Sequence, residues 1–225
     1  MRNDFKTVTA LLVLDLDGTL TPVRSSWRFL HIKLGSYFRA IKYYQLFFDG
    51  YITYDEWVYL DLSLWKGIKK SVIEKLLSEI PWRSGARELA SLRSYGCYTL
   101  VVSGGLDMLA RRAVEELALD DYIAVSLDVD ADGRVTGFSS SYIDFHGKGE
   151  AVKNYLEEKK LAPKMVISVG DSRNDIDLFK ASDLAIAFCP ENPDIARYAH
   201  YVVSDCDLSK VKKLVLKTIL EHAWC

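Results

Sequence analysis

The segment ALLVLDLDGTLTP, residues 10–22, carries two aspartates one residue apart, Asp15 and Asp17, directly after a run of apolar residues. The apolar run predicts a short strand that is buried on both faces, and Gly18 marks a turn after it. Two carboxylates at this spacing repel each other, and burying either one is costly unless a positive charge compensates it. The sequence therefore predicts that a cationic partner meets this strand end.

Apolar runs and helical stretches alternate along the rest of the chain. The pattern predicts strands over 10–16, 98–103, 122–127, 165–169, 184–188 and 201–203, helices over 106–117, 149–160 and 174–181, and a β-hairpin over 129–137 around Asp132-Gly133. Such alternation is typical of an α/β fold with a mostly parallel sheet that is covered by helices on both faces. Ligands of such sheets bind beyond the carboxyl ends of the strands, where the two aspartates are expected.

One long segment interrupts this alternation. Residues 22–81 show a helical pattern and no buried-strand pattern, and a proline stands at each end. We interpret the segment as a small helical lid, or cap, inserted into an α/β core that consists of residues 1–21 and 82–225. Between Trp27 and Trp65 it holds 13 of the chain's 27 aromatic residues. These rings either form the lid's own hydrophobic core or line an aromatic substrate pocket.

Two further polar clusters each follow a predicted strand, and a lysine lies at the start of a predicted helix. Ser103-Gly104-Gly105 follows the strand YTLVV, the segment GDSRNDIDLF follows MVISV, and Lys148 opens a helix in HGKGEAV. If the sheet is parallel, these clusters meet the first one at a single edge.

In order along the chain, DLDGTLT, VVSGG, Lys148 and GDSRND match the four motifs of the haloacid dehalogenase superfamily. The chain most resembles the hydrolase branch that contains phosphoserine phosphatase, because that branch also has VVSGG, a hairpin before the lysine and a helical lid. The resemblance implies a Rossmann-like core with a helical cap. It also implies hydrolysis of a small-molecule phosphomonoester with Mg²⁺ as the cofactor.

The carboxylates have distinct expected roles. Asp15 is expected to attack phosphorus and form an aspartyl-phosphate. Asp17 is expected to protonate the leaving alkoxide and then to take a proton from the hydrolytic water. Mg²⁺ prefers hard oxygen ligands, and Asp15, Asp171 and the backbone carbonyl of Asp17 are expected to hold it, with Asp175 supporting the site.

Four residues are expected to contact the phosphate. Lys148 would neutralise charge on the nucleophile and the phosphate, and Asn174 would add a hydrogen bond. The Ser103 hydroxyl and the Gly104 amide, expected at a helix N-terminus, suit the phosphoryl oxygens. Structural alternatives stay open, with Ser103 and Asp175 as simple helix caps and Lys148 as a surface lysine.

Two lid positions, Arg24 and Asp61, depart from the phosphoserine phosphatase pattern. That pattern places an acidic residue nine positions after the nucleophile, where this chain has Arg24, and an arginine in the lid, where alignment through DGYITYDEW gives Asp61. The two residues either pair with each other or leave Arg24 to receive a carboxylate or second phosphate. We therefore expect poor hydrolysis of phosphoserine, and better hydrolysis of a small anionic phosphomonoester without an amine.

Composition restricts the partners and the compartment. A net charge of -2 and a pI near 6.1 give no electrostatic reason to expect nucleic acid or an anionic membrane, so the expected partner is a small phosphorylated metabolite. The N-terminal segment lacks the form of a signal peptide, and no apolar stretch reaches the roughly 20 residues that span a bilayer, which favours the cytoplasm. Cys97 and Cys189 lie in or beside apolar runs and are expected to be small core residues.

Other functions share parts of this pattern. Phosphoserine phosphatase proper, a phosphotransferase and a phosphomutase would all use Asp15 and Asp17. A two-component receiver domain also phosphorylates a strand-end aspartate, but it lacks the acid/base residue and the long lid. A non-catalytic binding protein on the same fold would be expected to lose at least one motif, and this chain retains all four.

Overall fold

Strands and helices alternate along the chain in the computed structural model, which describes residues 5–222. The strands are β1 (Lys6–Val8), β2 (Ala10–Leu14), β3 (Cys97–Leu106), β4 (Asp121–Val125), β5 (Leu161–Pro163), β6 (Val166–Gly170), β7 (Leu184–Phe188) and β8 (Tyr201–Val203). The α-helices are α1 (Ser26–Lys33), α2 (Tyr37–Phe48), α3 (Tyr54–Ser63), α4 (Lys70–Leu77), α5 (Asp107–Leu117), α6 (Lys148–Glu158), α7 (Ile176–Lys180) and α8 (Leu208–His222). Within residues 5–222, no helix combines the length and apolar character that crossing a membrane requires.

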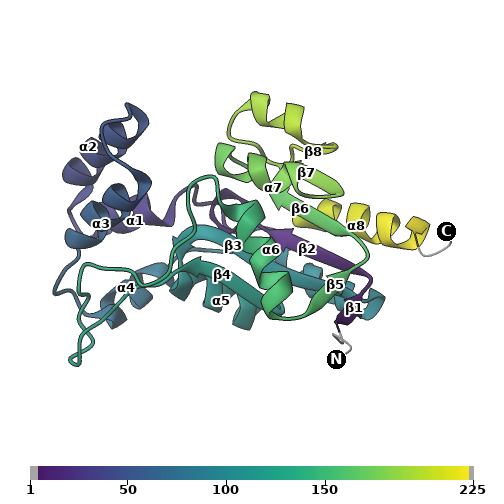
Figure 1. Cartoon of the computed structure of the whole chain (residues 1–225), viewed down its shortest axis with the longest axis horizontal. Helices are drawn as coiled ribbons and strands as arrows, with labels where there is room; N and C mark the ends of the chain where they lie inside the picture. Colours follow the sequence, from purple (N-terminus) through teal and green to yellow (C-terminus); the bar gives the residue numbers. More distant parts are fainter. Residues whose placement is uncertain (1–4, 223–225) are drawn as a thin grey trace.

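The main sheet confirms the predicted parallel α/β fold. Its six strands lie in the order β4-β3-β2-β6-β7-β8, and every neighbouring pair is parallel. The strand β2 is therefore flanked by β3 and β6, and the carboxyl ends of these three strands lie at one edge (Figure 1). A separate parallel pair, β1 with β5, was not predicted because neither of its segments, KTV and LAP, forms an apolar run.

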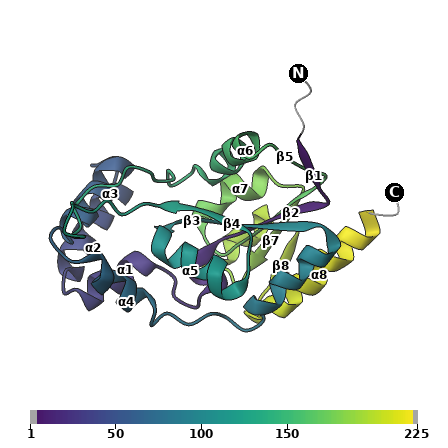
Figure 2. The same cartoon turned by 90° about the horizontal axis from the view of Figure 1, so that it is seen from below.

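Helices cover both faces of the sheet. Figure 2 shows α6 and α7 on one side and α5 and α8 on the other. Alternate residues of β2 enter different hydrophobic clusters: Leu12 and Leu14 belong to the larger cluster, and Leu11 and Val13 to a second one. All five residues of β2 are buried, as expected for a continuous apolar strand between two helical layers.

Between β2 and β3 the chain first forms the helices α1 to α4, which lie at the carboxyl end of the sheet (Figure 1). A 3-10 helix, Ala86–Tyr95, then leads into β3 and packs against α8. Apolar residues of α1 to α4, among them Leu30, Leu62 and Ile73, belong to the same buried cluster as the core strands. The helical insertion is thus packed on the sheet rather than joined to it only by its two connections. Residues 22–81 as a cap domain, on a core of 1–21 and 82–225, remain our proposed division of the chain.

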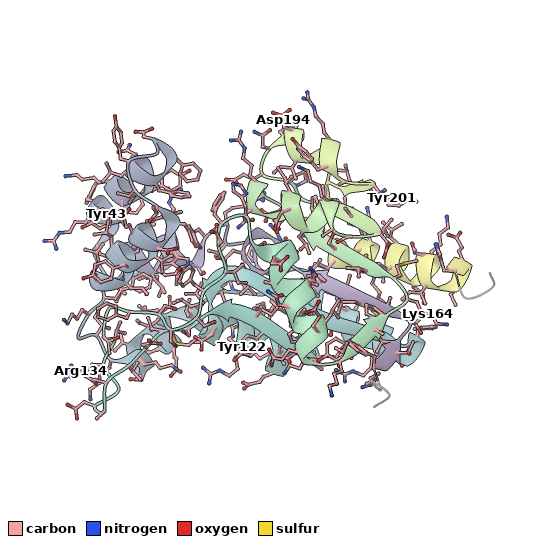
Figure 3. All side chains as sticks on the ribbon, in the orientation of Figure 1. Tyr43, Tyr122, Arg134, Lys164, Asp194 and Tyr201 are labelled. Carbon is pink, nitrogen blue, oxygen red and sulfur yellow. A yellow bond between two sulfur atoms is a disulfide. The ribbon has the colours of Figure 1, made fainter. Side chains whose placement is uncertain are left out.

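The loop between β4 and α6 reaches the helical insertion. Val129 and Val135 form a single antiparallel bridge, so the predicted hairpin is reduced to one bridged pair around a turn in which Gly133 has a φ of 71°. Arg134, labelled in Figure 3, pairs antiparallel with Lys69 just before α4. Its guanidinium Nη1 also donates to the Gly67 carbonyl at 2.9 Å. These contacts connect the loop to the insertion.

The cysteines differ from the sequence prediction in one respect. Cys97 is buried in β3, as expected. Cys189 packs against the core cluster but is only half-buried and forms a disulfide with Cys206, so it is a crosslinked residue at the edge of the core. The apolar run of β7 ends at Phe188, and Cys189, the first residue beyond it, has a left-handed φ of 44°. The disulfide joins the loop after β7 to the segment before α8.

Candidate active site

The fold brings the predicted polar clusters together at the carboxyl edge of the sheet. Asp15 follows β2, Ser103 lies near the end of β3, and Asp171 follows β6, and these three strands are neighbours. A cavity of about 520 Å³ opens beside them, and its walls include Asp15, Asp17, Ser103, Gly104, Asn174, Arg24 and Asp61. Core and insertion both contribute to it.

Lys148 supplies a positive charge to the first strand end. Its ammonium donates to Oδ1 of Asp15 and to Oδ1 of Asp175, each at 2.6 Å. The lysine is 1% exposed, so the alternative of a surface lysine is wrong. Burial opposes its charge, but the two carboxylates outweigh burial and hold the pKa of Lys148 above its usual value.

One lysine does not balance the charge of the three neighbouring acids, Asp15, Asp171 and Asp175. Burial raises the pKa of Asp15 well above its usual value; Lys148 opposes the shift, and the nearby carboxylates of Asp175 and Asp171 add to it. Burial and the charge of Asp175 likewise raise the pKa of Asp171 to about 7. A further cation at this place would favour the ionised form of both acids.

The carboxylates also suit a metal ion sterically. Asp15, Asp171 and Asp175 are buried, and each offers an oxygen within 4.8 Å of the others. Oδ1 of Asp171 is buried without a hydrogen-bond partner, which leaves it free to act as a ligand. Both oxygens of Asp175 are already used, since Oδ1 binds Lys148 and Oδ2 accepts from the backbone amides of Asp171 and Ser172 at 3.0 Å. Asp175 thus caps the turn after β6 and also orients Lys148.

Asp17 faces the helical insertion. Its Oδ2 accepts hydrogen bonds from the amide and hydroxyl of Ser26, at 2.8 and 2.7 Å, while its Oδ1 is buried without a partner. Burial raises the pKa of Asp17 although both Ser26 bonds oppose the shift, so the carboxyl is suited to carrying a proton. Sequence reasoning missed Ser26, for which the only local signal was its place at the start of a helix.

Gly18 permits the turn that separates the two aspartates. Its φ is 80°, and a Cβ added there would lie 2.1 Å from Oδ2 of Asp171. A larger residue would therefore collide with the carboxylate after β6 and would also strain the backbone.

Ser103 and Gly104 line the cavity but differ from expectation in their backbone setting. Ser103 and Gly104 lie within β3, whereas the helix α5 begins only at Asp107. Their expected place at a helix N-terminus was therefore wrong. The strand continues through the glycines with a register shift between Val102 and Leu106. Ser103 Oγ accepts from the Gly105 amide at 2.9 Å rather than capping a helix.

Two side chains from the insertion and the core complete this wall. The carbonyl of Gly104 accepts from the indole Nε1 of Trp27 at 2.9 Å, which attaches α1 to β3. Asn174 reaches the cavity with its Oδ1 accepting from the Ser172 hydroxyl at 2.6 Å.

Arg24 and Asp61 line the same cavity without pairing with each other. The guanidinium of Arg24 forms an ion pair with Asp171 and donates to the Cys189 carbonyl at 2.9 Å. Asp61 lies on α3 with its Oδ2 3.5 Å from Nε2 of His31. The alternative in which Arg24 and Asp61 close the lid together is therefore wrong, because the buried carboxylate of Asp171 attracts the arginine to the core instead.

Aromatic residues of the insertion form another part of the cavity wall. Trp27, Tyr44, Phe48, Tyr54 and Trp57 come from the insertion. Several of these rings also pack together, as in the pair Tyr44 and Phe48, whose centroids are 4.5 Å apart. The rings of the insertion thus pack on one another and also line the cavity, and their role in binding a substrate stays a prediction. Phe145, Glu191 and Asn192 also line the cavity and had no sequence signal.

Comparison with known families agrees with this arrangement. The model of the haloacid dehalogenase-like hydrolase family matches residues 12–180. The chain belongs to this family. The match begins within β2 and ends at the last residue of α7, so it includes all four motifs of this haloacid dehalogenase-like hydrolase together with the helical insertion.

Among its relatives, this hydrolase is similar to phosphoserine phosphatases. It is 30% identical to the phosphoserine phosphatase of Idiomarina loihiensis over 90% of this chain and 92% of that protein, and 30% identical to that of Methanocaldococcus jannaschii over 74% and 79%. Two solved structures, a phospho-aspartyl intermediate analogue of phosphoserine phosphatase and a substrate-bound phosphoserine phosphatase complex, each share 27% identity. Both superpose with a TM-score of 0.76, cover 93% of this chain, and are themselves covered to 99% and 98%. This hydrolase is therefore a phosphatase of the phosphoserine phosphatase type.

Proposed function

We propose that this chain is a Mg²⁺-dependent phosphatase that transfers the phosphoryl group of a small phosphomonoester to Asp15 and then to water. One observation carries the proposal: a buried strand-end carboxylate, bonded to a buried lysine, lies beside two further buried acids and lines a cavity. An isolated carboxylate would repel a dianionic ester, whereas here Lys148 and a bound cation would offset that repulsion.

Asp15 and Asp171 would hold Mg²⁺, together with the backbone carbonyl of Asp17, and Asp175 would keep the site in place through Lys148 and the backbone. When bound, the ion would supply the charge that lets a carboxylate approach a phosphate. Carboxylate oxygens with an unpartnered lone pair, such as Asp171 Oδ1, are suitable ligands for such a hard cation.

The protein's own groups would then divide the reaction. The Asp15 carboxylate would attack phosphorus, and Asp17, held by Ser26, would deliver a proton to the leaving oxygen. Asp17 would next remove a proton from the water that attacks the aspartyl-phosphate. Lys148, Ser103, the Gly104 amide and Asn174 would bind the phosphoryl oxygens, with Lys148 remaining bonded to Asp15.

The proposal is tested with an aryl phosphate in Mg²⁺ buffer. We expect release of inorganic phosphate by the wild-type chain and none by Asp15→Asn. A second assay with an added alcohol acceptor distinguishes hydrolysis from phosphotransfer, because a phosphotransferase would yield a new phosphate ester in place of free phosphate. Absence of turnover with aryl and alkyl phosphates alike would contradict the proposed function.

We further propose a cytoplasmic location for the enzyme. The disulfide between Cys189 and Cys206 is compatible with this location only in a heat-adapted source, because cytoplasmic proteins rarely contain disulfides outside hyperthermophilic organisms. The chain has a single glutamine, Gln45, and four asparagines, as is typical of heat-adapted proteins. Fractionation of the source cells, with the redox state of the two cysteines measured by thiol labelling, tests this location.

A further inference from the structure

Asp61 is a buried acid with a free oxygen at the substrate cavity. Its side chain on α3 lines the cavity, the residue is 4% exposed, and its Oδ1 makes no full hydrogen bond. Burial raises the pKa of Asp61, and the nearby donors of His31 and of the Trp57 indole oppose this shift. Trp57 Nε1 is itself buried without a hydrogen-bond partner, so it does not satisfy this oxygen. The other oxygen, Oδ2, lies 3.5 Å from His31 Nε2, which is too long for a strong hydrogen bond. A buried carboxylate oxygen without a partner costs free energy, so its position calls for a ligand that supplies a donor.

The scaffold behind Asp61 holds this carboxylate in place. Nδ1 of His31 lies 2.7 Å from the Ser36 hydroxyl, and the imidazole packs on the fully buried ring of Trp65, with the ring centroids 4.6 Å apart. Trp65 in turn stacks on Trp27, which is bonded to the Gly104 carbonyl of the core. Asp61 is thus fixed relative to the strand that binds the phosphate.

The surroundings of Asp61 favour a cation. The helices α1 to α3 contribute one charged side chain to the described wall of the cavity, Asp61, among the rings of Trp27, Tyr44, Phe48, Tyr54 and Trp57. The faces of aromatic rings attract ammonium groups, and a desolvated carboxylate adds a charge-assisted hydrogen bond. The cationic residues of the cavity, Arg24 and Arg173, lie outside these helices, and Arg24 is bound to Asp171.

We propose that the substrate is the phosphomonoester of an amino alcohol, whose ammonium group is bound by Asp61 and the aromatic wall while its phosphate lies at Asp15. This inference rests on the proposed phosphatase function and specifies its substrate class. It differs from the substrate expected from the sequence, an anion without an amine, because that expectation required a free Arg24.

The same geometry disfavours a carboxylate on the substrate. A carboxylate beside the ammonium, as in phosphoserine, would approach Asp61 in a low-dielectric wall and be repelled. Phosphoserine should therefore remain a poorer substrate than the amino alcohol phosphate that lacks the carboxylate.

The test compares matched pairs of substrates. The wild-type enzyme is assayed with ω-aminoalkyl phosphates of increasing chain length, with the ω-hydroxyalkyl phosphates of the same lengths, with phosphoserine and with an aryl phosphate. At the best chain length, we expect kcat/KM of the amino compound to exceed that of its hydroxy counterpart by about tenfold or more. Turnover of the aryl phosphate without this preference would overturn the substrate inference alone, whereas inactivity on every ester would contradict the phosphatase function.

Two variants assign the preference to Asp61. Asp61→Asn keeps the shape of the side chain and should reduce the amino-to-hydroxy ratio of kcat/KM about tenfold, mainly through KM. Asp55→Asn, an exposed change on the same helix, should leave the ratio as in the wild type. An unchanged ratio in Asp61→Asn, or a wild-type preference for phosphoserine or for the hydroxy series, would overturn the inference. If Asp61→Asn does not fold, the wild-type series still decides the question.

Discussion

The ammonium of Lys148 lies 2.6 Å from the carboxylate of Asp15, and both side chains are almost completely buried at the carboxyl edge of the sheet. The same ammonium lies 2.6 Å from Asp175, so one cation serves two acids that come from different strand ends. Asp15, the first aspartate of the opening motif, therefore finds part of its compensating charge 133 residues away in the sequence. The remaining negative charge explains why this edge of the sheet suits a metal ion.

Removal of this lysine should destabilise the metal-free protein. Lys148→Met would leave Asp15 and Asp175 buried without a cation, and the loss of one partner of a buried pair costs about 3–5 kcal/mol of unfolding free energy. Denaturant unfolding in EDTA measures the effect. The double variant Lys148→Met/Asp15→Asn should recover part of it.

Lys33→Met is a matched control, because Lys33 pairs with Glu79 at 2.6 Å on the exposed surface. An exposed pair contributes only about 0–1 kcal/mol. Equal losses in the Lys33 and Lys148 variants would contradict the electrostatic role of Lys148.

Asp15→Asn should abolish turnover while leaving the protein folded. The amide has nearly the same shape, Lys148 keeps its bond to Asp175, and burial already disfavours the charge of Asp15. We expect a change in unfolding free energy of less than about 1 kcal/mol. Single-turnover assays should detect no covalent phosphate on the variant, and residual turnover above a few per cent of wild type in a clean preparation would refute Asp15 as nucleophile.

Metal removal should silence the enzyme. EDTA followed by dialysis is expected to remove activity, Mg²⁺ to restore it, and Ca²⁺ to restore it poorly, since its larger coordination number lets a carboxylate bind through both oxygens and occupies the attacking one. An independent readout is thermal unfolding, because an ion that binds only the folded state raises the Tm. The rise should be smaller in Asp171→Asn. Full activity after exhaustive chelation would exclude the metal role.

Asp17→Asn should separate substrates by their leaving groups. An alkoxide needs a proton as it leaves, so turnover of an alkyl phosphate should fall by about 10²–10⁴-fold. An aryl phosphate releases a more stable anion and should lose much less activity. The ratio of the two kcat/KM values is the measurement. Equal losses on both substrates would indicate that Asp17 is structural, consistent with its two hydrogen bonds to Ser26.

The sheet and the strand-end aspartates could be predicted because both are set by local pattern and topology. The buried run of β2 and the alternation of strands and helices predict a parallel sheet, and a parallel sheet brings Asp15 and Asp171 to one edge whatever the details of packing. Lys148 could be placed there by its position at a helix start, but its two bonds depend on how α6 packs on the sheet.

Side-chain partners across the insertion could not be predicted in the same way. Whether Arg24 reaches Asp61 or Asp171 depends on the position of α3 relative to the core, and no local pattern specifies that distance. The glycines after Ser103 suggested a helix start, yet tertiary pairing with β4 prolongs the strand. Four cysteines allow several pairings, so the bond between Cys189 and Cys206 required the fold.

The disulfide should stabilise the protein next to its active site. Cys189 and Cys206 are 17 residues apart, and a crosslink that closes a loop of this size contributes about 2–4 kcal/mol. The loop also contacts the site, since the Cys189 carbonyl accepts from Arg24 at 2.9 Å and the Glu191 amide donates to the Asp171 carbonyl at 2.8 Å. Cys206→Ser should therefore lower the unfolding free energy by about this amount.

A reductant distinguishes the stability lost with the disulfide from any stability lost through the Cys206→Ser substitution itself. Dithiothreitol should destabilise the wild-type chain in thermal or denaturant unfolding and have no further effect on Cys206→Ser. Because the loop supports Asp171 and Arg24, loss of the crosslink should also raise the Mg²⁺ concentration needed for half-maximal stabilisation. A wild-type Tm that is insensitive to reductant, after thiol labelling has shown complete reduction, would contradict a stabilising role for this disulfide.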